Sequence, residues 1–432
     1  MELMDSWKQI NLGKSATLKA RIGWQGLTTA EYLSSGDYYL VTGTDFLNGF
    51  IDWDNCVHVE KERYDQDKYI QLQVDDILVT KDGTIGKVAI VDKIVKPTTL
   101  NSGVFVIRPF GKSFYPKYLY YILRSGHFAD FLSKLTAGST INHLYQKDFV
   151  HYIFPAPPTL REQKLIAETL SDTDILIQNL KTLIEKKKAI KQGAMQELLT
   201  GKKRLKGFYG EWRINKLGEI ADIKGGGTPS TTISEFWNGN IDWFTPTEVG
   251  KSKYIGGSKR KITQEGFENC SSLLFPKGTV LLTTRAGIGD LAILTKEACT
   301  NQGFQSFIVR KEIDNEFIYY RLNTLKSQFT SKASGSTFQE ISPNNLKSIE
   351  ISIPKLNEQK AIAQILSDMD SEIDELETQL RKTQNLKQGM MQELLTGKIR
   401  LVEPIGKSNK KEEISMAAES QLNYDIISKT KF

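Results

Sequence analysis

Two short glycine-containing turns stand where a phosphate-binding loop could be expected. DGTIG at 82–86 and AGIG at 286–289 each follow a run of apolar residues. A phosphate loop has the spacing G-x-x-x-x-G-K-[ST], in which backbone N–H groups and the lysine surround the phosphates. The segment GTIGKV is too short for that spacing and lacks the final hydroxyl residue. We therefore expect both turns to join neighbouring strands.

Residues that bind metals or act as nucleophiles also lack the necessary patterns. The four histidines lie in the first half and the three cysteines are far apart, without the ligand spacing of zinc or redox sites. Motifs such as G-x-S-x-G, H-E-x-x-H, the kinase set and [DNS]-P-P-[FYW] are absent. We predict no metal site and no catalytic residue. An enzyme remains an alternative, because dispersed carboxylates leave no local signature.

The composition is that of a soluble globular protein. The chain has 432 residues, 39% of them hydrophobic, and a net charge of +6, which permits nucleic-acid binding without establishing it. No run approaches the eighteen apolar residues of a membrane span. The start, MELMDSWKQI, has no secretory signal, and an odd number of cysteines suits a reducing compartment. We expect a cytoplasmic protein.

The elements that would position a site are revealed by an internal repeat. Residues 162–202 align without a gap with residues 358–398, and 24 of 41 positions are identical. In both copies apolar residues recur at alternating steps of four and three, the period of a coiled-coil seam. Each copy should form a helix of roughly 60 Å. The seam residues are Ile166, Leu170, Ile177, Leu180 and Ile184 in the first copy, and Ile362, Leu366, Met369, Ile373, Leu376 and Leu380 in the second.

Local signals mark the ends of both helices. Thr159 and Glu162 form a capping box before the first helix, and Asn357 can cap the second. Gly201 and Gly397 stand where a helix needs a left-handed residue at its C-terminus. The sequence therefore predicts two helices with defined starts and stops.

Each apolar seam needs a partner, because a lone helix of this kind is not stable in water. The order domain, helix, domain, helix favours antiparallel pairing of the two copies, with paired residue numbers that add to about 558. The alternative is that each helix packs on its own domain. In the antiparallel pairing, Gly193 would face the region of Leu366 and Gly389 the region of Leu170, which predicts either close backbone approach or a helix break.

Four lysines cluster late in the first helix, at Lys186, Lys187, Lys188 and Lys191. A solvated helix face is a more ordinary role for such a run than contact with DNA. We therefore leave them out of the candidate site.

The segments before the helices are also related to each other. ILVTKDGTIGKVAIV at 77–91 aligns with VLLTTRAGIGDLAIL at 280–294, and LTAGSTI at 135–141 with KASGSTF at 332–338. Short apolar strands with glycine turns and few helices favour an α+β class. We predict two mixed α/β domains separated by two long helices that form an antiparallel coiled coil, a pseudo-two-fold repeat. The boundaries are 1–157, 158–205, 206–353, 354–401 and a tail at 402–432 without a counterpart.

Several stretches resemble one family, the specificity subunit of type I restriction-modification systems. They include RIGWQGLTTAEYLSSGDYYLVTGTDF, IKGGGTPSTTISEFWNGNIDWFTPTEVG, and the repeated P…EQK.IA..LSD.D and QELLTGK of the helices. The resemblance covers residues 7 to 401. It implies two target-recognition domains, each reading one half of a bipartite, asymmetric DNA site. The helices would set the gap between the halves, and the chain would have no catalysis of its own.

The resemblance also implies partners. These are double-stranded DNA, two methyltransferase subunits that use S-adenosylmethionine, and restriction or translocase subunits that use ATP and Mg; none of these cofactors would bind this chain, and no membrane is involved. A second hypothesis is a non-catalytic coiled-coil scaffold without DNA sequence reading. A third is an enzyme fused to a spacer.

If the resemblance holds, polar loop residues should contact DNA, because Arg, Lys, Asn, Gln, Ser and Thr read base edges and phosphates. Lys81 and Arg285 are the strongest candidates, since they lie one alignment position apart in the repeated turn. Trp53, Trp237 and Trp243 are better explained as domain core. The full set of candidates is Trp24, Gln25, Thr44, Lys81, Thr84, Ser139, Thr140 and Asn142 in the first domain, and Thr228, Ser230, Thr245, Thr247, Arg285, Ser336, Thr337 and Gln339 in the second.

Overall fold

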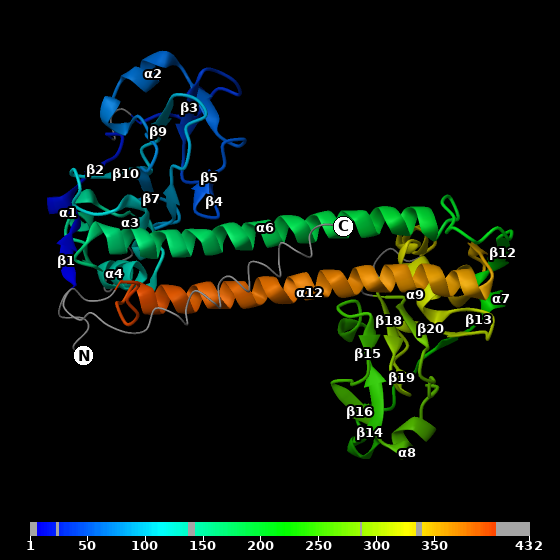
Figure 1. The fold of residues 1–432 in the computed structure, drawn as a ribbon. Coiled ribbons are helices and arrows are strands. Elements are labelled where there is room, and N and C mark those ends of the chain that lie inside the picture. The colour runs from blue at the N-terminus through cyan, green and yellow to red at the C-terminus, as the bar shows by residue number, and fades with distance from the viewer. Residues whose placement is uncertain (1–6, 23–25, 137–142, 286, 334–338, 403–432) are drawn as a thin grey trace, which may run out of the picture. The chain divides into compact units, whose positions relative to one another are not determined.

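The computed structural model describes residues 7–22, 26–136, 143–285, 287–333 and 339–402. The chain divides into two compact units (Figure 1). The first unit comprises Met1–Gln178 and Arg381–Phe432, and the second comprises Asn179–Leu380. Each unit therefore holds one domain and a segment of each long helix. Within the described ranges, no helix is long and apolar enough to cross a membrane.

The first unit is built around an antiparallel sheet of four strands. Their order is β2 (Ala16–Lys19), β10 (Val104–Pro109), β7 (Ile77–Thr80) and β8 (Val88–Ile90). A second sheet has the order β6 (Val57–Val59), β3 (Tyr38–Val41) and β9 (Thr98–Leu100), and two further pairs are β1 (Lys8–Asn11) with β11 (Ile153–Ala156) and β4 (Phe46–Leu47) with β5 (Phe50–Ile51). The helices of this domain are α1 (Leu12–Ser15), α2 (Lys61–Asp65), α3 (Pro116–Leu123), α4 (Gly126–Thr136) and α5 (Gln146–Phe149), with 3₁₀ turns at Thr29–Glu31 and Lys68–Ile70.

The second unit repeats this plan with one more strand in its main sheet. The order is β13 (Ala221–Gly225), β20 (Phe304–Val309), β17 (Val280–Thr283), β18 (Leu291–Leu294) and β15 (Tyr254–Ile255). The smaller sheets are β16 (Arg260–Ile262), β14 (Trp237–Phe244) and β19 (Cys299–Thr300), and the pair β12 (Arg213–Lys216) with β21 (Glu350–Ile353). The helices are α7 (Leu217–Ile220), α8 (Gln264–Glu268), α9 (Asn315–Asn323), α10 (Lys326–Ser331) and α11 (Pro343–Lys347), with 3₁₀ turns at Ser234–Phe236 and Pro246–Glu248.

The two glycine turns join neighbouring antiparallel strands, which confirms their predicted role. One connects β7 to β8 and the other connects β17 to β18. Gly83 and Gly86 have φ of 66° and 81°, and Gly287 and Gly289 have φ of 112° and 92°. These left-handed values favour glycine, because a Cβ atom would clash with the backbone.

The long helices α6 (Leu160–Leu198) and α12 (Leu356–Leu394) run antiparallel within each unit (Figure 1). In the first unit, Asp174 of α6 forms an ion pair with Lys387 of α12. In the second unit, Lys191 of α6 pairs with Asp370 of α12. In both pairs, the observed register of the two helices differs from the predicted one by about three residues, which is less than one helical turn.

The seam residues fall into two groups, those at the start of each helix and those further along it. Ile166 and Leu170 are fully buried in the core of the first domain, and Ile362 and Leu366 occupy the same place in the second. The start of each helix therefore packs on its own domain, as the alternative hypothesis proposed. Further along, Ile177, Leu180, Ile184 and Ile373 are buried, and Met369, Leu376 and Leu380 are half-buried.

The C-terminal end of each long helix packs in the core of the other domain: that of the first helix in the second domain, and that of the second helix in the first domain. Leu198 and Leu199 of the first helix region lie in the core of the second domain, and Leu394 and Leu395 lie in the core of the first. Gly201 and Gly397 both have φ of 72°, so the predicted left-handed ends are confirmed.

Two predictions about the helices were wrong. A Cβ at Gly193 or Gly389 would meet no atom within 4 Å. Both residues lie inside unbroken helix, so neither close approach nor a break explains them. Asn357 is not a cap, because α12 already begins at Leu356.

The lysine run lies on a solvent-accessible helix face, where two of its members also meet acidic side chains. Lys187 lies 2.5 Å from Glu372 and Lys188 lies 2.9 Å from Glu377, both on α12. These exposed pairs favour the observed register through charge complementarity, each by a modest amount.

Candidate nucleic-acid interface

Three loops meet beside the main sheet of the first unit. They are residues 42–45 after β3, 81–87 between β7 and β8, and 101–103 between β9 and β10. The Asn101 N–H donates to the Val41 carbonyl at 2.9 Å, and the Lys81 N–H donates to the Gly103 carbonyl at 2.9 Å. A Cβ at Gly43 would lie 2.9 Å from the Thr80 methyl group. We call these three loops the first loop platform.

The second unit builds the same arrangement from loops 245–248, 284–290 and 301–303. The Asn301 N–H donates to the Phe244 carbonyl at 3.0 Å, and the Thr284 N–H donates to the Gly303 carbonyl at 2.8 Å. A Cβ at Gly303 would lie 2.7 Å from a ring carbon of Pro246. This is the second loop platform, and its backbone contacts repeat those of the first.

In each platform a carboxylate fixes one threonine, through both its backbone N–H and its hydroxyl. Asp45 accepts from the Thr42 N–H at 2.7 Å and from its hydroxyl at 3.0 Å. Glu248 accepts from the Thr245 N–H at 2.9 Å and from its hydroxyl at 2.8 Å. Burial raises the pKa of Asp45, and the hydrogen bonds from Thr42 oppose that shift. Such a braced loop holds its neighbouring side chains in a defined place.

A buried threonine fixes the second loop of each platform in the same way. The Thr80 hydroxyl donates to the Thr84 carbonyl at 2.5 Å and accepts from the Lys87 N–H at 2.9 Å. The Thr283 hydroxyl donates to the Gly287 carbonyl at 2.6 Å and accepts from the Asp290 N–H at 3.0 Å. These hydrogen bonds hold each turn without using the side chains of Asp82 or Arg285.

Most of the described candidate residues lie on or beside these platforms with exposed side chains. Exposed members are Thr44, Thr84, Ser230, Thr247, Arg285 and Gln339. Thr245 is engaged by Glu248, and the Thr228 hydroxyl donates to the Gln302 side chain at 2.5 Å. Trp24, Gln25, Ser139, Thr140, Asn142, Ser336 and Thr337 lie outside the described residues.

Lys81, one of the two strongest candidates, is placed differently from Arg285. Its ammonium group lies 5.6 Å from the centre of the Phe105 ring, a buried core residue. Arg285 is 47% exposed, and its Nε atom lies 2.8 Å from a carboxylate oxygen of Glu340. Of these two residues, Arg285 has the exposed side chain, whereas that of Lys81 is partly buried.

Residues that the sequence reasoning missed flank these turns. Asp82 contacts the Nδ1 atom of His143 beside the first platform, and Arg285 forms an ion pair with Glu340 beside the second. The aligned segments 77–91 and 280–294 already placed Asp82 opposite Arg285. The candidates were restricted to Arg, Lys, Asn, Gln, Ser and Thr, apart from Trp24, so this criterion excluded Asp82, His143 and Glu340.

A second repeated cluster joins each domain to the helices. The Tyr121 hydroxyl donates to Asp174 at 2.9 Å, and the Tyr320 hydroxyl donates to Asp370 at 2.6 Å. Burial raises the pKa of both tyrosines, and the neighbouring aspartates add to the shift. The phenols therefore remain donors at neutral pH.

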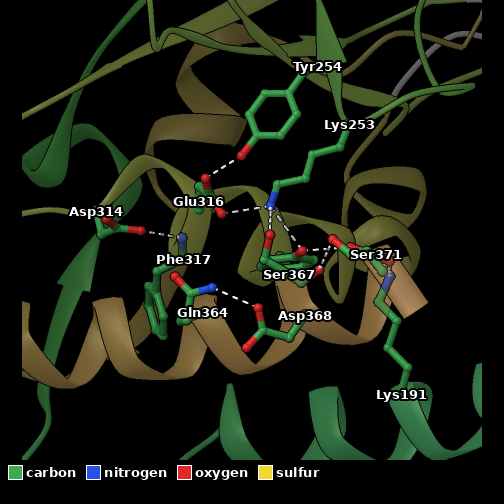
Figure 2. Close-up of polar contacts among 12 residues, drawn as sticks. Lys191, Lys253, Tyr254, Asp314, Glu316, Phe317, Gln364, Ser367, Asp368 and Ser371 are labelled. Atoms are coloured by element: carbon green, nitrogen blue, oxygen red, sulfur yellow. Dashed lines mark hydrogen bonds and ion pairs between the residues drawn. The ribbon is translucent and has the colours of Figure 1, made fainter. Parts of the chain in front are cut away.

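The second unit adds a lysine to this cluster. Figure 2 shows Lys253 between Glu316 of α9 and Ser367 of α12, at 2.6 Å and 3.1 Å. Tyr254 also contacts Glu316. Lys253 is only 11% exposed, so these partners compensate its desolvation. The contacts fix the loop before β15 on α12.

The tryptophans belong to the core, as predicted. Trp53, Trp237 and Trp243 are buried, and the indole N–H of Trp243 donates to the Gly227 carbonyl at 2.8 Å. Among the described residues, no group of three or more His, Cys, Asp or Glu could hold a metal ion. The side chains that the platforms present are hydrogen-bond donors and acceptors.

Comparison with known proteins agrees with this double arrangement. The family profile described as type I restriction modification DNA specificity domain matches residues 7–189 and 209–386. The putative type I restriction enzyme MjaX specificity subunit of Methanocaldococcus jannaschii is 30% identical over 397 residues, which are 87% of this chain and 90% of that protein. The MjaIX specificity subunit of the same organism is 40% identical over 168 residues, 38% of this chain and 39% of that protein.

Solved structures share the fold. The S subunit of a type I restriction-modification system from M. genitalium aligns with a TM-score of 0.57 and 17% identity, covering 90% of this chain and 96% of that one. The family profile matches both halves of the sequence repeat, and each half carries one loop platform and one long helix. The chain thus belongs to the specificity subunits of type I restriction-modification systems.

Proposed function

We propose that each loop platform reads one half of a bipartite, asymmetric DNA site and that α6 and α12 set the gap between the halves. One observation supports this proposal above the others. The backbone contacts of the platforms repeat, whereas the exposed side chains differ, as with Asp82 and Arg285. Equivalent backbone scaffolds with different exposed hydrogen-bond donors and acceptors are suited to recognising different base sequences.

The chemistry would reside in partner subunits. We propose that this chain is non-catalytic and that its helices dock two methyltransferase subunits, which use S-adenosylmethionine to methylate adenine. Restriction or translocase subunits that use ATP and Mg would join through them. The three cysteines are free thiols, which suits work in the cytoplasm, where the DNA is.

Single-molecule mapping of methylated adenine tests this function in cells that carry the methyltransferase, with and without this chain. The expected result is methylation at one split sequence only when the chain is present. A scaffold without DNA reading predicts methylation with no sequence preference, and turnover by the purified chain alone would indicate an enzyme. Binding of the split site should also weaken steeply with salt, because phosphate contacts release counterions.

A further inference from the structure

The two loop platforms place an acidic and a basic residue at the same position of the repeated turn, each in contact with a polar side chain on the segment that faces the turn. Asp82 lies two residues after Thr80 at the end of β7, and it pairs with His143. Arg285 lies two residues after Thr283 at the end of β17, and it pairs with Glu340. In the first unit the acidic residue, Asp82, thus lies on the turn. In the second unit the acidic residue, Glu340, lies on the segment that faces the turn.

The facing segments are anchored alike. His143 and Glu340 each precede a buried aliphatic residue, Leu144 at 2% exposure and Ile341 at 0%. In the first unit, the Leu144 N–H donates to the Lys81 carbonyl at 2.8 Å, which aligns the two strands of backbone. The backbone thus positions residues 82 and 143 without help from their side chains.

The charged groups contribute little to holding these loops. Side-chain exposure is 43% for Asp82, 30% for His143, 47% for Arg285 and 37% for Glu340. Exposed pairs of this kind are worth little to stability, because water and salt screen them. The threonine hydroxyls of Thr80 and Thr283 already fix the turns. A purely structural role therefore leaves the reversed polarity unexplained.

The reversed polarity does have a consequence for recognition. An arginine donates two hydrogen bonds to O6 and N7 of guanine in the major groove. A carboxylate accepts from the amino group of cytosine, and it repels the acceptor-rich edge of guanine. The side chain in contact with each group, His143 for Asp82 and Glu340 for Arg285, holds it in a fixed orientation before binding, which lowers the entropy that must be lost.

We infer that these two pairs determine specificity, an inference that rests on the proposed function. In the second platform Arg285 donates to a guanine while Glu340 orients its guanidinium. In the first platform Asp82 accepts from the exposed amino group of a base, with His143 orienting its carboxylate. The two half-sites consequently differ at the base pair that these residues meet.

The test is single-molecule mapping of methylated adenine in cells that carry the methyltransferase and one variant of the full chain. Arg285→Ala should reduce the preference for one base pair by on the order of tenfold to a hundredfold in one half-site only. Arg285→Lys should keep methylation with a weaker preference, because lysine lacks the planar fork. Asp82→Asn should change one base pair of the other half-site.

A charge swap separates reading from structure. Arg285→Glu combined with Glu340→Arg keeps an ion pair at this place but exchanges donor and acceptor. The base sequence recognised in that half-site should therefore change. Thermal melting should be unchanged, which shows that the variant is folded. Controls are Arg213→Ala and Asp92→Asn, exposed residues of the same two units away from the platforms, and they should leave both words intact.

The outcomes distinguish this inference from the function on which it rests. If the native chain directs methylation to a split site and both words survive Asp82→Asn and the charge swap, the inference is wrong and the function stands. If the native chain gives no split site, the proposed function itself fails.

Discussion

The carboxylate of Asp174 on α6 lies 2.6 Å from the ammonium group of Lys387 on α12, and Tyr121 of the first domain donates to the same carboxylate. Lys387 also lies 5.8 Å from the centre of the Tyr121 ring. One aspartate therefore joins two helices and a domain. Partly buried polar groups of this kind favour one helix register, because slippage leaves them without partners.

Lys387→Met should destabilise the chain by about 1–3 kcal/mol, because Asp174, which is 19% exposed, loses its nearer cationic partner and keeps only the more distant Arg124 at 3.9 Å. Denaturant unfolding measures the loss. Lys382→Met changes an exposed lysine of the same helix and should shift the free energy of unfolding by less than about 0.5 kcal/mol. Equal effects of the two variants would show that the ion pair does not matter.

Arg400→Met should be more damaging. Glu162 is fully buried and meets Arg400 through two hydrogen bonds, one of them 2.7 Å. Loss of the Arg400 guanidinium leaves the buried carboxylate of Glu162 unpaired, which costs about 3–5 kcal/mol. Arg204 meets Glu358 in the same way at 2.6 Å and 2.7 Å in the second unit. Thermal unfolding of Arg204→Met should therefore show a similar loss, and a change below about 0.5 kcal/mol in either variant would contradict this account.

The helices were predictable from sequence to the extent that their signals are local. A seam of period four and three depends on neighbouring residues, and so do the left-handed ends at Gly201 and Gly397. The start of α12 was misplaced because Asn357 has a good capping side chain, whereas the chain already turns helical at Leu356. Capping preference alone does not decide between adjacent positions.

Gly193→Ala and Gly389→Ala should each stabilise the chain by up to about 1 kcal/mol. An added methyl group meets no atom within 4 Å at either position, and alanine has the higher helix propensity. Gly201→Ala and Gly397→Ala are the matched controls, and they should destabilise it because both residues have φ of 72°. A loss of stability in Gly193→Ala, measured by thermal melting, would mean that the helix surface is contacted there.

The candidate site was less accessible to prediction, because it is formed by tertiary contacts. Thr44, Thr84, Thr247 and Arg285 lie on loops whose polar composition alone suggested them. The approach of loop 42–45 to Thr80 depends on backbone packing that no short motif records. Lys81 looked as accessible as Arg285 in sequence, and only the position of the Phe105 ring distinguishes them.

Insertion of one heptad in both helices should lengthen the gap between the half-sites. Seven residues add about 10.5 Å of helix, which corresponds to about three base pairs of DNA. Opposite positions are after Lys181 in α6 and after Gln379 in α12. Methylation mapping should show the same two words farther apart, and an unchanged gap would refute the role of the helices as a spacer.

The same insertion in α6 alone is the control. It moves Lys191 out of register with Asp370, so the ion pair between the helices is lost. Lower thermal stability and weaker methylation are expected, without a new gap of fixed length.

The most direct measurement is the methylation map of a chain in which residues 206–353 are replaced by a copy of residues 1–157. Both platforms would then carry the side chains of the first. The account predicts methylation at an inverted repeat of the first half-site with the native gap. A map that keeps the native asymmetric sequence, or one without sequence preference, would contradict the claim that each domain reads its own half.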